Sequence, residues 1–95
     1  MKYLFTAIIY CETSLVSTDP KLVYNHFKNI EESKGEAYIS SNDDYWISII
    51  EMDKIGAKEV TFEGSSDFLD FMGKFEISEE EVNRRFNNTN TWLNN

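Results

Sequence analysis

Two side chains, Cys11 and His26, are the first candidates for catalysis in this chain of 95 residues. They are its single cysteine and its single histidine, and a thiol next to an imidazole is a common nucleophilic pair. The sequence gives little support for the geometry of nucleophile, base and orienting residue that such a pair needs, so a buried thiol and a partly exposed helical histidine explain them better. The two residues also cannot supply the usual nitrogen and sulfur ligands of a zinc site.

Other catalytic and ligand-binding motifs are missing from the sequence. The segment Ser41–Asp44 lacks the alternating ligands and the glycine of a calcium loop, and the four glycines are too scattered to form a phosphate cradle. Adjacent acids at Asp43-Asp44 and Glu79–Glu81 could do acid–base chemistry, but turn hydrogen bonds and the helix dipole account for them. We therefore predict that the chain is not an enzyme and binds no metal and no cofactor.

The apolar pattern predicts a single α+β domain over residues 1–95, with elements in the order βαβββαα. Lys2–Thr13 is largely apolar on both alternating faces, which favours the central strand of a mainly antiparallel sheet. The run Ser17–Pro20 then begins a helix. We expect that helix to end at Gly35 and to carry an apolar stripe made of Leu22, Val23, Phe27 and Ile30.

The second half of the chain predicts more strands and two further helices. Glu36–Ser41 and Asp44–Met52 read as a hairpin joined by Ser-Asn-Asp. In Lys58–Glu63 apolar and charged residues alternate, which is typical of an edge strand with one solvated face. A short helix follows Gly64-Ser65-Ser66, and Ser78-x-x-Glu81 matches the capping box of the last helix.

Negative charge is concentrated in Glu51–Glu81, where ten carboxylates face only three lysines. This stretch has a formal charge of −7, close to the −8 of the whole chain. An acidic field repels nucleic-acid phosphates and attracts basic surfaces. We therefore expect no direct nucleic-acid binding, and a partner protein with a basic surface.

Rows of carboxylates on a rigid scaffold can imitate the phosphates of duplex DNA, which repeat about every 3.4 Å along each strand. Glu59, Glu63, Asp67 and Asp70 lack an obvious local role in turns or caps. The predicted acidic surface that binds the partner consists of Glu59, Glu63, Asp67, Asp70, Glu76, Glu79 and Glu80. An extension of it would add Glu31, Glu32, Glu36, Asp43, Asp44 and Asp53.

In length, acidity, α+β character and a composition poor in proline, the chain resembles the small acidic DNA-mimic inhibitors of phages. Examples are the anti-restriction proteins of T-even phages and some anti-CRISPR proteins. This is a resemblance of type, carried by no motif. It implies an inhibitor in the host cytoplasm that blocks a DNA-binding host protein, such as a restriction or other defence nuclease. Arg84 and Arg85 interrupt the acidic field, so we expect the last helix to lie off the mimic face.

Three other interpretations stay open at this point. The charge can serve solubility alone, or the chain can be an immunity-type or antitoxin-type protein that masks a basic toxin or nuclease. The third is a structural or assembly subunit, because the sheet carries more aromatic residues than short helices readily cover. Ordinary core packing also uses such residues. A symmetric dimer would bury one sheet face. The aromatic residues concerned are Tyr10, Tyr38, Tyr45, Trp46 and Trp92.

Cysteine usage and the N-terminus favour a cytoplasmic protein. A single cysteine cannot form an internal disulfide, which favours a reducing compartment. Thr6 interrupts the first apolar run and Tyr10 stands where a signal peptide has a small residue. No stretch reaches the roughly 18 apolar residues of a membrane span, so we expect no membrane contact.

Overall fold

A four-stranded antiparallel sheet organises the computed structural model, which describes residues 3–51 and 59–88. The strands lie in the order β2-β1-β3-β4, with β1 at Tyr3–Ile9, β2 at Glu12–Ser17, β3 at Trp46–Glu51 and β4 at Glu59–Phe62. The predicted α+β class is confirmed, and β1 is an inner strand as expected.

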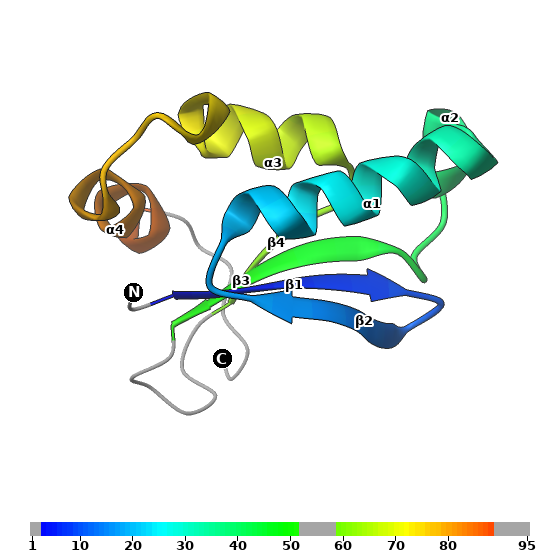
Figure 1. Cartoon of the computed structure of the whole chain (residues 1–95), viewed down its shortest axis with the longest axis horizontal. Helices are drawn as coiled ribbons and strands as arrows, with labels where there is room; N and C mark the ends of the chain where they lie inside the picture. The colour runs from blue at the N-terminus through cyan, green and yellow to red at the C-terminus, as the bar shows by residue number, and fades with distance from the viewer. Residues whose placement is uncertain (1–2, 52–58, 89–95) are drawn as a thin grey trace.

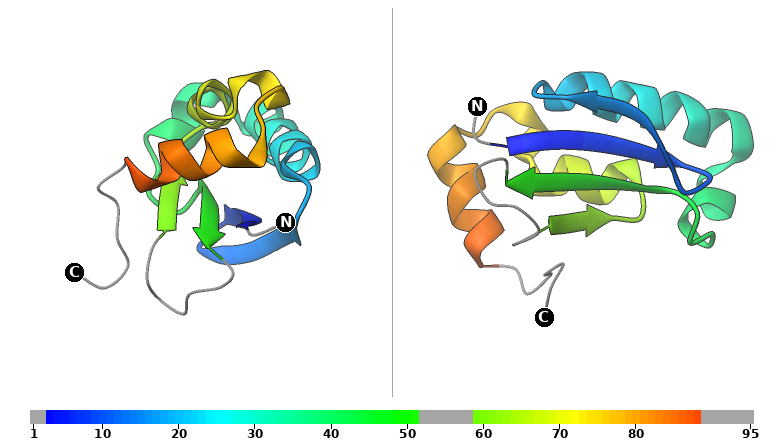
Figure 2. Two further views of the ribbon diagram at one scale, coloured as in Figure 1. Left: turned by 90° about the vertical axis from the view of Figure 1, so that its left-hand side faces the viewer. Right: turned by 90° about the horizontal axis from the view of Figure 1, so that it is seen from below.

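The helices pack on one face of this sheet (Figure 1). Helices α1 and α3 lie across the sheet, α2 lies at one end of it and α4 at the other, and the view from below leaves the opposite face of the strands uncovered by helices (Figure 2). The helical elements are α1 at Pro20–Lys34, α2 at Glu36–Ser40, α3 at Ser65–Phe71, the 3-10 turn η1 at Gly73–Phe75, and α4 at Glu79–Asn87.

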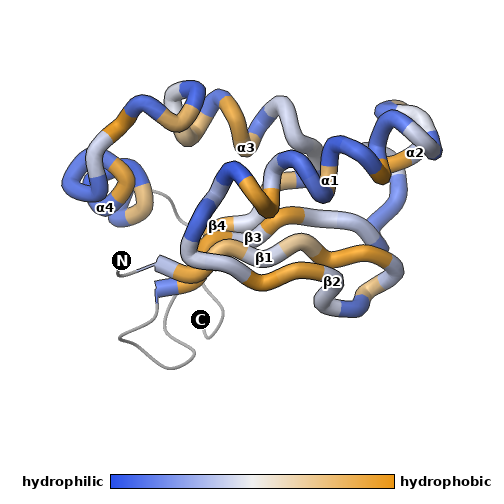
Figure 3. The backbone as a smooth tube through the Cα atoms, viewed as in Figure 1, coloured by the Kyte–Doolittle hydropathy of each residue, from blue (hydrophilic) through white to orange (hydrophobic). Residues whose placement is uncertain are grey.

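The core lies between the sheet and the helices and is rich in aromatic rings. Phe68 of α3 meets Phe5 of β1 and Phe62 of β4, with ring centroids 6.2 and 5.5 Å apart. At the other end of β1, Tyr3 packs on Phe86 of α4 at 5.1 Å. Figure 3 shows the apolar positions gathered along the strands, while α2 carries both hydrophilic and hydrophobic positions. Burial of these rings, together with the aliphatic core residues, holds the layers together.

The N-terminal apolar run forms a hairpin instead of one strand. Ile9 pairs with Glu12, so Tyr10 and Cys11 form a two-residue turn with φ of 55° and 63°. Two left-handed residues define a type I′ turn, which normally carries Asn-Gly. The sequence prediction missed strand β2 because neither residue signals a turn.

The predicted strand Glu36–Ser41 is wrong, because these residues form the short helix α2. Gly35 adopts φ of 97°, which lets the chain turn sharply after α1 and begin a new helix. Glu36 stands in the first turn of α2, where the helix dipole favours an acid, and Ile39 is its buried residue. The observed element order is therefore ββααββα, then η1 and α4.

Several boundaries match the predictions from local chemistry. Asp19 caps α1 by accepting a hydrogen bond from the Lys21 amide, and Ser78 caps α4 by accepting from the Glu81 amide. Strand β4 is an edge strand with Val60 and Phe62 buried. Leu22 departs from its expected place in the α1 stripe, since it is largely exposed.

The sheet face opposite the helices is closed at its centre within the single chain. Thr6 and Ile8 of β1 and Ser48 of β3 point away from the helical layer, yet all three are buried. The dimer stays a prediction.

Strain in the β1–β2 turn yields a stability prediction. A non-glycine residue in the left-handed region costs about 1–2 kcal/mol, and part of this is recovered when Cys11 becomes glycine, despite the extra entropy of the unfolded chain. We expect Cys11→Gly to raise the free energy of unfolding by about 0.5–1 kcal/mol, measured by urea denaturation. The control Cys11→Ala keeps the strain and should not stabilise; equal stability of the two variants would contradict a strained turn.

Candidate functional site

Two adjacent pockets lie between α2 and the β4–α3 connection, and they share Ser40 and Glu63. The larger, which we call the acidic pocket, has a volume of about 380 Å³. Its lining contains four carboxylates and no basic residue, and consists of Glu31, Glu36, Ala37, Ser40, Glu63, Gly64, Ser66 and Asp67. The smaller, which we call the aromatic pocket, has a volume of about 170 Å³.

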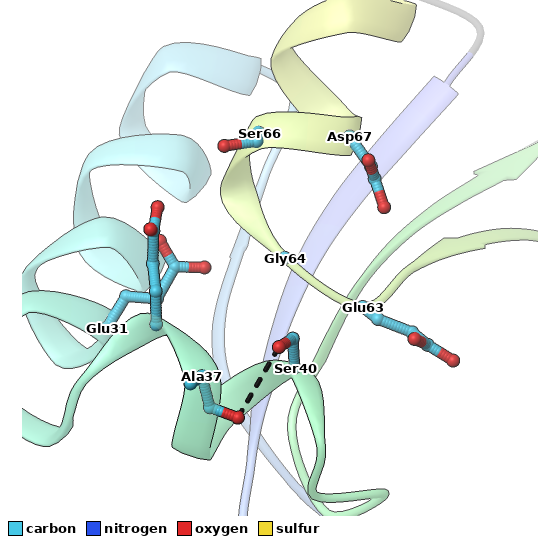
Figure 4. Close-up of a pocket in the computed structure, with 8 residues that line it drawn as sticks. Glu31, Ala37, Ser40, Glu63, Gly64, Ser66 and Asp67 are labelled. Atoms are coloured by element: carbon cyan, nitrogen blue, oxygen red, sulfur yellow. Dashed lines mark hydrogen bonds between the residues drawn. The ribbon is translucent and has the colours of Figure 1, made fainter.

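The acidic pocket brings together three exposed acids from two elements. Glu36 belongs to α2, whereas Glu63 and Asp67 stand just before and within the first turn of α3. Figure 4 shows Glu63 and Asp67 on one side of the pocket and Glu31 with Ala37 on the other. Glu36, Glu63 and Asp67 form no ion pair with the described residues. The pocket therefore presents uncompensated negative charge.

Glu31 is buried beneath the pocket, contrary to its expected place on the binding surface. Only 3 % of the residue is exposed. One of its carboxylate oxygens accepts from the Ser65 backbone N–H at 2.9 Å, and the other accepts from the Ser65 hydroxyl at 2.5 Å. Glu31 of α1 thus caps the N-terminus of α3, where the helix dipole also favours a negative charge. Its role is to hold the pocket walls in place.

The remaining predicted acids divide between different surfaces. Glu59 and Thr61 alternate with the buried Val60 and Phe62, so Glu59 lies on the face opposite the helices and away from α3. Asp70, Glu76, Glu79 and Glu80 are exposed along the chain that leads from α3 to α4, toward the end of the molecule opposite α2. The structure thus brings Glu63 and Asp67 together with Glu36 but does not add Glu59.

The predicted extension is also only partly supported. Asp43 is exposed and lines the aromatic pocket. Asp44, its neighbour, accepts a hydrogen bond from the Cys11 thiol at 3.2 Å, so it lies beside the β1–β2 turn. Glu32 is exposed outside both pockets. Asp53 lies outside the described residues.

Asp67 has a local explanation that the sequence analysis did not give it. It stands in the first turn of α3, where an acid is stabilised by the helix dipole. The pocket walls from α2 were missed as well, because Glu36–Ser41 was expected to be a strand. The sequence did contain a signal for a second helix at this point. Glycine commonly ends a helix, as Gly35 does here, and the Glu36 and Ala37 that follow it both favour helices.

The aromatic pocket is bounded by rings that the fold holds firmly. Tyr45, Trp46 and Phe62 line it together with Asp43 and Glu63. The rings of Tyr10 and Tyr38 pack on Tyr45, at centroid distances of 5.0 and 6.1 Å. Burial raises the pKa of Tyr45, and the nearby Tyr10 hydroxyl adds to this effect. The Tyr45 hydroxyl forms no well-aligned hydrogen bond with the described residues.

Arg84 and Arg85 are engaged within the protein. Arg84 donates two hydrogen bonds to Glu81, at 2.5 and 2.7 Å, and Arg85 donates to the backbone carbonyls of Asp70 and Phe71. Arg85 therefore joins α4 to the C-terminal end of α3. Both arginines lie outside the two pockets, and so does the whole of α4.

Cys11 and His26 do not form a pair. Cys11 is exposed, which corrects the expectation of a buried thiol, and it donates to Asp44. His26 is half-buried on α1 and its Nε2 lies 2.6 Å from the Ser14 hydroxyl of β2. Among the described residues, no three His, Cys, Asp or Glu side chains gather as metal ligands would. The described helices include none that is long and apolar enough to cross a membrane.

Comparison with family models, with curated proteins and with solved structures found no match to this chain. The two pockets and the charge around them are the structural features that bear on function.

The buried cap yields a prediction about stability. Glu31→Ala leaves the Ser65 amide and hydroxyl without their acceptor, and an unsatisfied buried donor costs about 1–3 kcal/mol. We expect urea denaturation to show a loss of this size for Glu31→Ala and a smaller loss for Glu31→Gln, which retains one acceptor oxygen. The matched control is the exposed neighbour Glu32→Ala. Equal effects at positions 31 and 32 would contradict the capping role.

Glu81 yields a prediction about pH. Hydrogen bonds from Arg84 lower the pKa of the Glu81 carboxyl in the folded state. A lowered pKa stabilises the folded protein above the unfolded pKa, and this stabilisation disappears as pH falls through the folded pKa. Glu81→Gln should therefore be less stable than wild type near pH 7, and the difference should shrink as pH falls below the ordinary glutamate pKa and through the lowered folded pKa. Unfolding midpoints across pH test this, with Glu80→Gln as control; a difference that persists in acid would contradict the assignment.

Proposed function

We propose that this chain is an inhibitor protein that occupies the basic, DNA-binding surface of another protein. The observation that carries the proposal is the meeting of Glu36, Glu63 and Asp67 around one pocket, without a basic residue in its lining. Carboxylates fixed in this way repel one another until a cation arrives. A basic surface is therefore both attracted from a distance and stabilised on contact.

Further exposed acids follow the pocket along the helical layer. Asp67 and Asp70 are one helical turn apart on α3 and both are exposed, and Glu76 and Glu80 follow toward α4. The Cα trace is 33 Å long on its major axis, comparable to about ten steps of 3.4 Å along a DNA strand. A chain of this length could cover about one turn of a duplex-binding surface, and we propose a protein that grips duplex DNA, such as a nuclease, as the target.

A second candidate is an immunity-type or antitoxin-type inhibitor that masks a basic toxin without copying DNA. It is favoured by one feature, because Glu36, Glu63 and Asp67 surround a hollow, whereas the phosphates of DNA border its grooves as ridges. A hollow lined by acids receives projecting basic side chains. Both candidates predict a basic partner, and they differ in whether duplex DNA competes for it.

The test uses the immobilised chain and a bacterial lysate. Proteins captured at about 50 mM salt are eluted with duplex DNA, and each eluted protein is then assayed for DNA binding with and without the chain. We expect competition with duplex and a steep loss of capture toward about 200 mM salt, because several charge pairs are broken together.

Two charge-reversed variants with the same net charge serve as the comparison. Glu36→Lys, Glu63→Lys and Asp67→Lys should together abolish capture. The second variant combines Glu12→Lys, Glu32→Lys and Asp44→Lys, which change three exposed acids outside the acidic pocket. This variant should still capture the partner. Capture that resists excess duplex would refute the DNA-binding surface as the target, and its dependence on the acidic pocket would then favour the immunity-type inhibitor.

A further inference from the structure

We propose that the aromatic pocket receives the guanidinium group of an arginine from the partner protein. The inference rests on the proposed function for the presence of a basic partner, and it adds which side chain enters and where. The pocket holds about 170 Å³, which is below the roughly 300–1,000 Å³ of typical small-molecule sites. A single side chain is therefore a better occupant than a cofactor.

The composition of the walls favours arginine over lysine. The half-buried Trp46 supplies the accessible aromatic surface, with the buried rings of Tyr45 and Phe62 behind it, and Asp43 and Glu63 supply carboxylates on the same pocket. A guanidinium is planar, stacks on aromatic faces and donates to carboxylates through a rigid fork, whereas an ammonium is a compact and more strongly hydrated charge. A pocket that combines rings with acids thus matches the chemistry of arginine.

The position of the pocket also suits insertion of a side chain. It opens beside the acidic pocket, with which it shares Ser40 and Glu63. Glu63 can therefore contact a cation in either pocket. Trp46 is half-buried, and Tyr45 is fixed behind the wall by the rings of Tyr10 and Tyr38. Rigid aromatic surface of this kind loses little conformational entropy on binding, as in the anchor sites of protein interfaces.

Two peptides of equal charge test the proposal on the intact chain, one of six arginines and one of six lysines. Titration calorimetry gives their affinities, and the Trp46 indole N–H resonance, assigned with Trp46→Phe, reports on the pocket. We expect the arginine peptide to bind roughly two- to fivefold more tightly and to shift the Trp46 indole resonance more than the lysine peptide does.

Adjacent acids provide the matched variants. Asp43→Asn should lower the affinity for the arginine peptide by up to about fivefold. The carboxylate of Asp44 lies beside Cys11, so Asp44→Asn should change this affinity by less than about twofold. Trp46→Leu, with folding checked by circular dichroism, should remove the preference for arginine. Equal affinities for the two peptides, or equal effects of the two asparagine variants, would overturn the pocket assignment. Binding that still depends on Glu36 and Asp67 in that case would leave the proposed function standing.

Discussion

A buried carboxylate, Glu31, joins helices α1 and α3 at the wall of the acidic pocket. Both of its oxygens accept hydrogen bonds from Ser65, so the end of α1 fixes the start of α3. The Gly64 backbone passes so close that an added Cβ would lie 3.3 Å from Glu31. The exposed acids Glu63 and Asp67 stand on either side of this junction, so the bonds between Glu31 and Ser65 restrain the backbone that carries them. One acid is thus withdrawn from solvent, and its exposed neighbours are held in a fixed arrangement at the pocket.

The parts of the fold that depend on local chemistry could be predicted from the sequence. The helix caps at Asp19 and Ser78 follow from side-chain oxygens that accept backbone N–H bonds, and both are present. The alternation of Val60 and Phe62 with polar residues correctly placed β4 at the edge of the sheet. These signals act within a few residues, so they do not need knowledge of the tertiary structure.

The arrangement of the site residues is set by contacts between distant parts of the chain, which local sequence patterns do not show. The burial of Glu31 follows from a partner 34 residues later in the chain, so its carboxylate could not be told apart from the exposed one of Glu32. The Tyr10-Cys11 turn forms although neither residue favours left-handed φ, because the flanking strands pair and the ring of Tyr45 supports it. The segment Glu36–Ser41 is too short for periodicity to separate a helical turn from a strand. Acidity was therefore evident from the sequence, whereas its grouping into a pocket was not.

The exposed thiol of Cys11 gives the protein a native attachment point for a chemical reporter. It is the single cysteine of the chain and stands at the tip of a tight hairpin, hydrogen-bonded to the residue that follows Asp43. A maleimide dye placed there would carry its probe to the end of the sheet nearest the aromatic pocket without any engineered cysteine. Because the bond to Asp44 raises the pKa of the thiol, labelling will proceed faster in mildly alkaline buffer than at neutrality.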